Sequence, residues 1–166
     1  MSRRWAGLLA AVAILLSACS SPARPPLERI TGACPLLIAP EIKFFLGSGL
    51  LAVEHNFGGV NETLYSCSYT RDNRIVFDFN IREFPAPGSD PASVVSSIGR
   101  RSRLTTTPIV GVGEAAIYYE QPATHVAVLV AVKRSGPNLR LISFDAVTPF
   151  SSSRLAALGA IVMARI

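Results

Sequence analysis

The sequence predicts an α+β fold: an antiparallel sheet of about six strands with two or three helices packed on it, in the order α-βββ-α-βββ-α. Three observations support this prediction. Runs in which apolar residues alternate occur in two groups, each preceded by a segment of helical character. A third helical pattern closes the chain. The connections within each group are short and rich in turn residues, which is typical of antiparallel neighbours.

The expected helices begin at recognisable start signals. Residues 39–47 ("APEIKFFLG") place Pro40 in a first turn and end at Gly47. Asp90 or Ser89 caps a second helix, with proline at its first position, and serines at 151–153 cap a third. Each helix has an apolar stripe that predicts its buried side, and these stripes are Ile42, Phe45 and Leu46; Val94, Val95 and Ile98; and Leu155, Leu158, Ile161 and Val162.

The clearest strand is "RIVFDFNIR" (74–82), where apolar residues alternate with Asp78, Asn80 and Arg82. Because that second face is polar, we expect part of the sheet to meet solvent. Residues 125–133 ("HVAVLVAVK") are apolar on both faces, which predicts a central strand under a helix. The "RDN" and "RSGPN" segments are predicted hairpin turns. The six expected strands span residues 50–55, 63–70, 74–82, 114–120, 125–133 and 138–146.

The N-terminus has the layout of a lipoprotein signal peptide. Two arginines precede an apolar run, and the stretch "LSAC", which ends at Cys19, is similar to a lipobox. The resemblance implies cleavage before Cys19, diacylglyceryl transfer to its thiol and acylation of the new amine, and two or three such chains hold a protein firmly at a membrane. An ordinary cleaved signal peptide is the alternative. We therefore expect export, with a lipid anchor on the extracytoplasmic side of the cell membrane.

These features divide the chain into three parts. Residues 1–18 are the expected signal peptide, residues 19–33 are the lipidated cysteine with a proline-rich tether, and residues 34–166 are a single globular α+β domain. The full sequence has 16 Lys and Arg residues against 11 Asp and Glu residues. Without the two leader arginines the net charge is +3, which is too small an excess to predict a nucleic-acid partner.

Cys34 and Cys67 remain once Cys19 carries lipid. Two cysteines in an exported domain most simply form a disulfide, because that compartment is oxidising. A redox or metal-binding pair is the alternative, but the sequence has no CxxC motif to lower a thiol pKa.

No catalytic, metal-binding or cofactor-binding set is predicted. His55 and His125 are the two histidines, and neither lies in an HxxxH or HxH spacing. A trio of His125, Asp145 and a serine would have to be assembled by the fold, and the sequence has no G-x-S-x-G motif.

The candidate ligand or partner surface consists of four tyrosines and one acid. Tyrosines combine apolar area with a polar tip, which suits recognition. The acid lies in "GVGEAA" (111–116), which is either a glycine turn that leads into a strand or a close approach of the backbone to a ligand. The candidates are Tyr65, Tyr69, Glu114, Tyr118 and Tyr119.

Several short motifs together resemble a family. "CPLLIAPEIKFFLG", "SCSYT", "GVGEAA" and the final Leu/Ala-rich helix are similar to the small actinobacterial cell-envelope lipoproteins of unknown function. The layout is also similar to the extracellular sensor domains of mycobacterial membrane kinases. The resemblance covers most of residues 33–166. It implies a lipidated envelope domain with a Cys34–Cys67 disulfide, and it brings no catalytic residues.

The sequence therefore predicts a non-enzymatic, membrane-anchored envelope lipoprotein that binds a partner protein or a small envelope ligand, besides the membrane lipid itself. A small envelope hydrolase and a structural or assembly accessory lipoprotein are the alternatives. The hydrolase requires His55 or His125 within hydrogen-bond reach of both a serine and an acid in a cleft.

Overall fold

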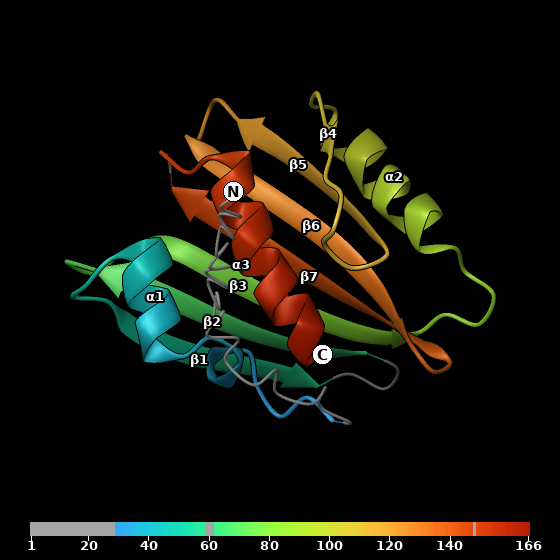
Figure 1. The fold of residues 1–166 in the computed structure, drawn as a ribbon, viewed down its shortest axis with the longest axis horizontal. Coiled ribbons are helices and arrows are strands. Elements are labelled where there is room, and N and C mark those ends of the chain that lie inside the picture. Colours follow the sequence, from blue (N-terminus) through green and yellow to red (C-terminus); the bar gives the residue numbers. More distant parts are fainter. Residues whose placement is uncertain (1–28, 59–61, 148) are drawn as a thin grey trace, which may run out of the picture.

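The structure, a computed structural model, describes residues 29–58, 62–147 and 149–166 (Figure 1). These residues form one antiparallel sheet in the spatial order β1-β2-β3-β7-β6-β5-β4, with helices on both faces. The helices are η1 (Cys34–Leu36, a 3-10 turn), α1 (Ala39–Leu46), α2 (Pro91–Ser102) and α3 (Ser152–Arg165). The strands are β1 (Leu51–Gly58), β2 (Thr63–Arg71), β3 (Arg74–Pro85), β4 (Thr107–Pro108), β5 (Ala115–Gln121), β6 (Val126–Ser135) and β7 (Asn138–Val147).

The predicted α+β class and antiparallel sheet are confirmed, and three α-helices agree with the predicted two or three, but the strand number differs. The described residues form seven strands rather than about six, because β4 pairs with Tyr118 and Ile117 of β5. A strand of two residues is too short to show alternation, so the sequence pattern could not reveal it. Pro108 is compatible with that edge position, where it breaks no internal ladder of hydrogen bonds.

One face of the sheet is covered by α1 and α3, which lie on the viewer's side in Figure 1. The main core lies beneath them. Phe77 of β3 packs against Phe144 of β7 at a ring-centroid distance of 5.3 Å, and Phe79 packs against the same ring at 4.9 Å. Leu155 and Leu158 of α3 are fully buried in this cluster. The predicted buried side of the last helix is therefore the side that meets the sheet.

The opposite face carries α2 over β5 and β6. Val95 of α2 is buried in a second apolar cluster with Tyr119, Val128 and Val130, and Ile98 packs against it. Strand β6 thus lies between two helix-bearing faces and two neighbouring strands. This is the central position that its two apolar faces predict.

Local signals fix the ends of the elements. Asp90 caps α2, since its Oδ2 accepts a hydrogen bond from Ser93 N at 3.0 Å, and Ser151 caps α3 by accepting from Arg154 N at 3.3 Å. The turn between β2 and β3 has positive φ at Asp72 (51°) and Asn73 (60°). These two residue types tolerate that left-handed conformation, which a tight hairpin needs.

The folded domain begins before Cys34, earlier than the sequence predicts. Ile30, inside the expected tether, is 2 % exposed and belongs to the main core. The sulfur atoms of Cys34 and Cys67 lie 2.00 Å apart, which ties η1 to β2, and Arg165 of α3 holds Glu41 of α1 at 2.6 Å. The expected signal peptide, Cys19 and the first part of the tether lie outside the described residues.

Candidate functional site

The α2 side of the sheet is only half covered. Over β1, β2, β3 and β7, the described part of the chain places no helix on this side. We call this area the open face. From the strand register, its polar centre consists of Ser66, Ser68, Asp78, Asn80, Ser143 and Asp145, and its apolar rim consists of Leu51, Val53, Phe57, Ile75 and Val147.

The rim concentrates the exposed apolar surface. Among the described residues, seven large apolar side chains are exposed, and five of them belong to the rim of the open face. The other two, Phe44 on α1 and Val110 in the loop before β5, lie elsewhere. Single exposed apolar residues are ordinary, but a group on one sheet face is typical of an interaction surface.

At the centre, a carboxylate is held firmly. Asp78 Oδ1 accepts hydrogen bonds from Ser68 Oγ at 2.7 Å and from Ser66 Oγ at 3.5 Å. Its Oδ2 accepts from Asn80 Nδ2 at 3.0 Å. These donors come from the adjacent strand β2 and from the next position on the same face of β3, so the strand pairing itself orients the Asp78 carboxylate.

Asp145 lies directly opposite Asp78 across the β3–β7 pair. Side chains in that relation have Cβ atoms about 5 Å apart, and like charges there repel. Burial and then the Asp78 charge raise the pKa of Asp145 to about 6. Within the described residues, neither carboxylate takes part in an ion pair. In the described residues the open face therefore has at its centre a half-buried pair of acids that no cation pairs with.

A groove of about 450 Å³ runs between α2 and this centre, lined by Ile98 and Arg101 of α2 and by Tyr119, Ser143 and Asp145 of the sheet. Arg82, also in its wall, pairs with Glu62 at 2.7 Å. The Arg101 guanidinium donates to Ser97 Oγ at 3.3 Å and to Ser97 O at 3.4 Å. Both groove cations thus have partners other than the two acids.

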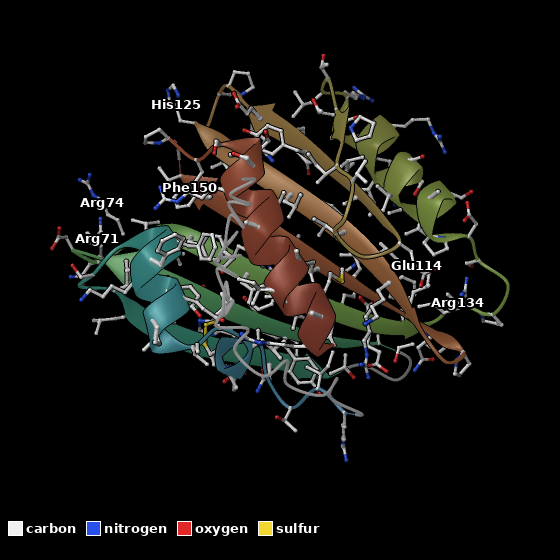
Figure 2. All side chains as sticks on the ribbon, viewed as in Figure 1. Arg71, Arg74, Glu114, His125, Arg134 and Phe150 are labelled. Atoms are coloured by element: carbon white, nitrogen blue, oxygen red, sulfur yellow. A yellow bond between two sulfur atoms is a disulfide. The ribbon has the colours of Figure 1, made fainter. Side chains whose placement is uncertain are left out.

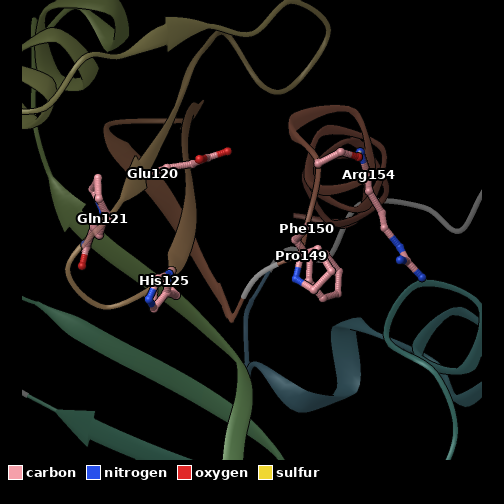
Figure 3. A pocket seen from close by; sticks show the side chains of 9 residues that line it. Glu120, Gln121, His125, Pro149, Phe150 and Arg154 are labelled. Atoms are coloured by element: carbon pink, nitrogen blue, oxygen red, sulfur yellow. The ribbon is translucent and has the colours of Figure 1, made fainter.

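A second depression, of about 670 Å³, lies at one end of the sheet (Figure 3). Its charged groups are already engaged. Tyr118 Oη donates to Glu120 Oε1 at 2.5 Å, while the Arg154 guanidinium lies 5.0 Å from the centre of the Phe150 ring and donates to the carbonyl of Phe44. Arg154 also extends away from His125 in Figure 3. No set of free polar groups converges there, so the open face is the stronger candidate.

The trio that the hydrolase alternative would require is not assembled in the described residues. His125 is exposed in the turn before β6 and lines the depression at the sheet end, whereas Asp145 lines the groove beside α2. His55 is exposed on β1, opposite Ser66. In the part of the chain that the structure describes, neither imidazole is hydrogen-bonded to a serine or to a carboxylate.

The four candidate tyrosines do not share a surface. Tyr69 is 1 % exposed in the main core, and Tyr118 is buried with its hydroxyl on Glu120. Tyr65 is half-buried against the main core, and Tyr119 alone lines the groove beside the open face. The reason is the period of the strand, because adjacent positions such as 118 and 119 point to opposite faces.

The "GVGEAA" segment is a structural turn. A Cβ atom at Gly113, which has a φ of 62°, would lie 2.6 Å from the carbonyl oxygen of Val132. Glu114 N donates to that same oxygen at 2.9 Å, and Glu114 Oε1 accepts from Arg134 N at 2.7 Å (Figure 2). The glycine permits a close approach of two backbones rather than of a ligand. Glu114 therefore does not extend the candidate surface.

The fold and the open face define a small α+β protein whose single sheet has one covered and one half-covered side. No family model matches its sequence, and no curated protein does. A solved structure from Bacteroides thetaiotaomicron VPI-5482, determined at 1.50 Å, is 13 % identical over 62 % of this chain, with a TM-score of 0.37. The match spans 38 % of that chain, and at this score it carries no argument.

The helices in the described residues are short compared with a membrane span. None of those between residues 29 and 166 is long and apolar enough to cross a bilayer.

Proposed function

We propose that the protein is a non-enzymatic envelope lipoprotein, anchored through acyl chains on Cys19, that binds a partner protein through the open face. The observation that carries the proposal is the grouping of five exposed apolar side chains around Asp145 and Asp78. Isolated in water, such a surface is costly for the folded protein, since it exposes apolar area and crowds two acids.

A protein partner fits this surface better than a small ligand. Small-molecule sites are concave and enclose most of the ligand. The rim residues Leu51, Val53 and Phe57 instead lie along the edge strand β1, whose residues are all exposed. A protein interface usually has an apolar core and a polar rim. Here the two acids lie at the centre, so a protein partner would have to supply a counter-charge to them.

The proposed location rests on the N-terminal sequence. The lipobox-like stretch at Cys19 supports export and lipid anchoring, and the proline-rich segment after it supports a tether between the anchor and the domain. The resemblance to small actinobacterial envelope lipoproteins, and to kinase sensor domains in layout, supports the same placement.

Intact mass spectrometry of the protein purified from its own membrane tests this proposal. We expect a chain that begins at Cys19 and carries two or three acyl chains, and we expect Cys19→Ser to leave the membrane fraction. Ser20→Ala, a change one residue further on, is the matched control and should stay membrane-bound. A wild-type chain without acyl mass would refute the anchor.

The histidine-dependent hydrolase has no support in the described residues, but the acid pair favours an envelope hydrolase that uses carboxyl groups instead, and this is the second candidate. Two facing carboxyl groups, one with a pKa near 6, suit general acid–base chemistry. This candidate predicts turnover of envelope glycans by the purified protein, and loss of that turnover in Asp145→Asn. Turnover that is unchanged in the variant would exclude the acid pair as its source. A structural or assembly accessory role instead predicts loss of an envelope complex when the protein is deleted.

A further inference from the structure

The uncovered strip has the width of one helix. Adjacent strands lie about 4.8 Å apart, so the distance from β1 to β7 is roughly 14 Å. An α-helix with its side chains is about 10–12 Å across. Since α2 already covers β5 and β6 on the same side, a second helix would fit beside it over β2 and β3.

The rim supplies the apolar contacts for such a helix. Leu51, Val53 and Phe57 project from one face of β1 along one side of the strip, and His55 lies between the last two on the same face. Ile75 is exposed on the same face at its end, and Val147 is exposed at the end of β7, where it also lines a cavity with Leu46 and Phe150 of the covered side. On the other half of this face, Val95 and Ile98 of α2 pack against Val128 and Val130 in the same manner.

The centre of the strip imposes a second requirement. A wholly apolar helix would bury the carboxylates of Asp78 and Asp145 without a counter-charge, which is strongly unfavourable. Among the described residues no arginine forms an ion pair with either acid: Arg82 pairs with Glu62, while Arg101 lines the same groove as Asp145 but bonds to the neutral Ser97 and keeps its charge. The complementary group is a cation placed within an apolar stripe.

A second copy of the chain does not readily provide this helix. Each of the helices α1, α2 and α3 in the described residues packs its apolar stripe against its own sheet. The described helices are therefore already packed, and the expected signal peptide is removed on export, which favours another protein as the source of the occupant.

We infer that the open face binds one helix of a partner protein, and that the apolar stripe of this helix carries a lysine or arginine that pairs with Asp78 and Asp145. The inference rests on the proposed function and specifies the chemistry of the partner. A helix in a groove is a common recognition mode, and the buried charge pair would fix its register.

Photocrosslinking in the native envelope tests the inference. A photoreactive amino acid replaces Val53 in the full-length, lipidated protein, and the control probe replaces Val110, which is 95 % exposed and away from the open face. We expect the Val53 probe to capture a peptide with apolar residues three and four apart and with a basic residue between them. In the Asp78→Asn/Asp145→Asn protein its yield should fall by about tenfold or more.

Matched variants separate charge loss from misfolding. Asp72→Asn/Asp90→Asn makes the same chemical change at two exposed sites and should leave the yield unchanged, because Asn tolerates the turn at 72 and caps a helix at 90. Charge reversal adds a second readout. Asp145→Lys should abolish the crosslink, and exchange of the captured basic residue for Asp should restore it.

The outcomes that overturn the inference are distinct. Capture from position 53 of a second copy or of lipid alone would refute it, as would a yield that does not depend on the two acids. Capture of a protein from position 110 but not from 53 would refute the helix site and leave the proposed function standing. Capture of no protein from either position would refute both.

Discussion

Replacement of Asp145 by Asn should stabilise the folded protein at neutral pH. Asp145 is half-buried opposite Asp78, and its pKa rises from 3.8 to about 6 through burial and then through the Asp78 charge. The other titratable and charged groups around it are Tyr119 on β5, Arg82 on β3 and Arg101 on α2. Burial and then the Asp145 charge raise the pKa of Tyr119 in turn.

The size of this stabilisation follows from the linkage between proton binding and folding. The folded protein binds the Asp145 proton more tightly than the unfolded chain does, so this proton stabilises the fold fully below pH 3.8. That contribution is lost as the pH rises from 3.8 to about 6, and above pH 6 the full penalty applies. A change in pKa of this size corresponds to about 3 kcal/mol. Because Asp145 keeps some contact with solvent, we expect Asp145→Asn to gain about 2 kcal/mol at pH 7.

Urea unfolding at a series of pH values between 3.5 and 7.5 measures this gain. The wild-type free energy of unfolding should fall relative to the variant between pH 4 and 6, and the two curves should converge near pH 3.5. Asp72→Asn, at an exposed turn, is the control and should follow the wild type at every pH. If the variant is no more stable than the wild type at pH 7, then burial of Asp145 and its repulsion by Asp78 do not destabilise the fold as argued.

Three further predictions concern the stability of the domain that carries the open face. Tyr69→Phe should raise the free energy of unfolding by about 1 kcal/mol, because the buried Tyr69 hydroxyl has no hydrogen-bond partner in the described residues; a loss of stability in urea would reveal a partner. Gly113→Ala should cost about 2–4 kcal/mol, from its positive φ and the contact with the Val132 carbonyl, and an unchanged thermal midpoint would contradict that close approach. Cys34→Ser should lower stability by about 4 kcal/mol, since its disulfide with Cys67 closes a loop with a sequence separation of 33 residues; the reduced wild type should match the variant, and a stable reduced form would contradict this estimate.

The elements with strong local signals could be predicted from the sequence. The alternation of 74–82 gives strand β3 and its polar face, and Asp90 with Pro91 gives the start of α2. The apolar run of residues 125–133 gives the central position of β6. In each case the sequence pattern that predicts the element lies within about ten residues, and the tertiary packing favours the same structure as the local pattern.

The centre of the candidate site could not be predicted in that way. Asp78 and Asp145 are 67 positions apart in the chain, and only the pairing of β3 with β7 brings them opposite each other. Their signal in the sequence is weak: each is the polar member of an alternating strand, which by itself indicates a solvated face. Ile30 was missed for a related reason, because a single apolar residue in a proline-rich segment shows no period.

Carboxyl footprinting tests the central claim that a partner covers the open face. Labelling of acidic side chains with a carbodiimide and an amine is compared between the protein in its native membrane and the purified protein, at one pH. We predict that Asp78 and Asp145 are protected in the membrane and labelled after purification, while exposed Asp72, Asp90 and Glu114 are labelled equally in both. Equal labelling of Asp145 in the two preparations would contradict the claim.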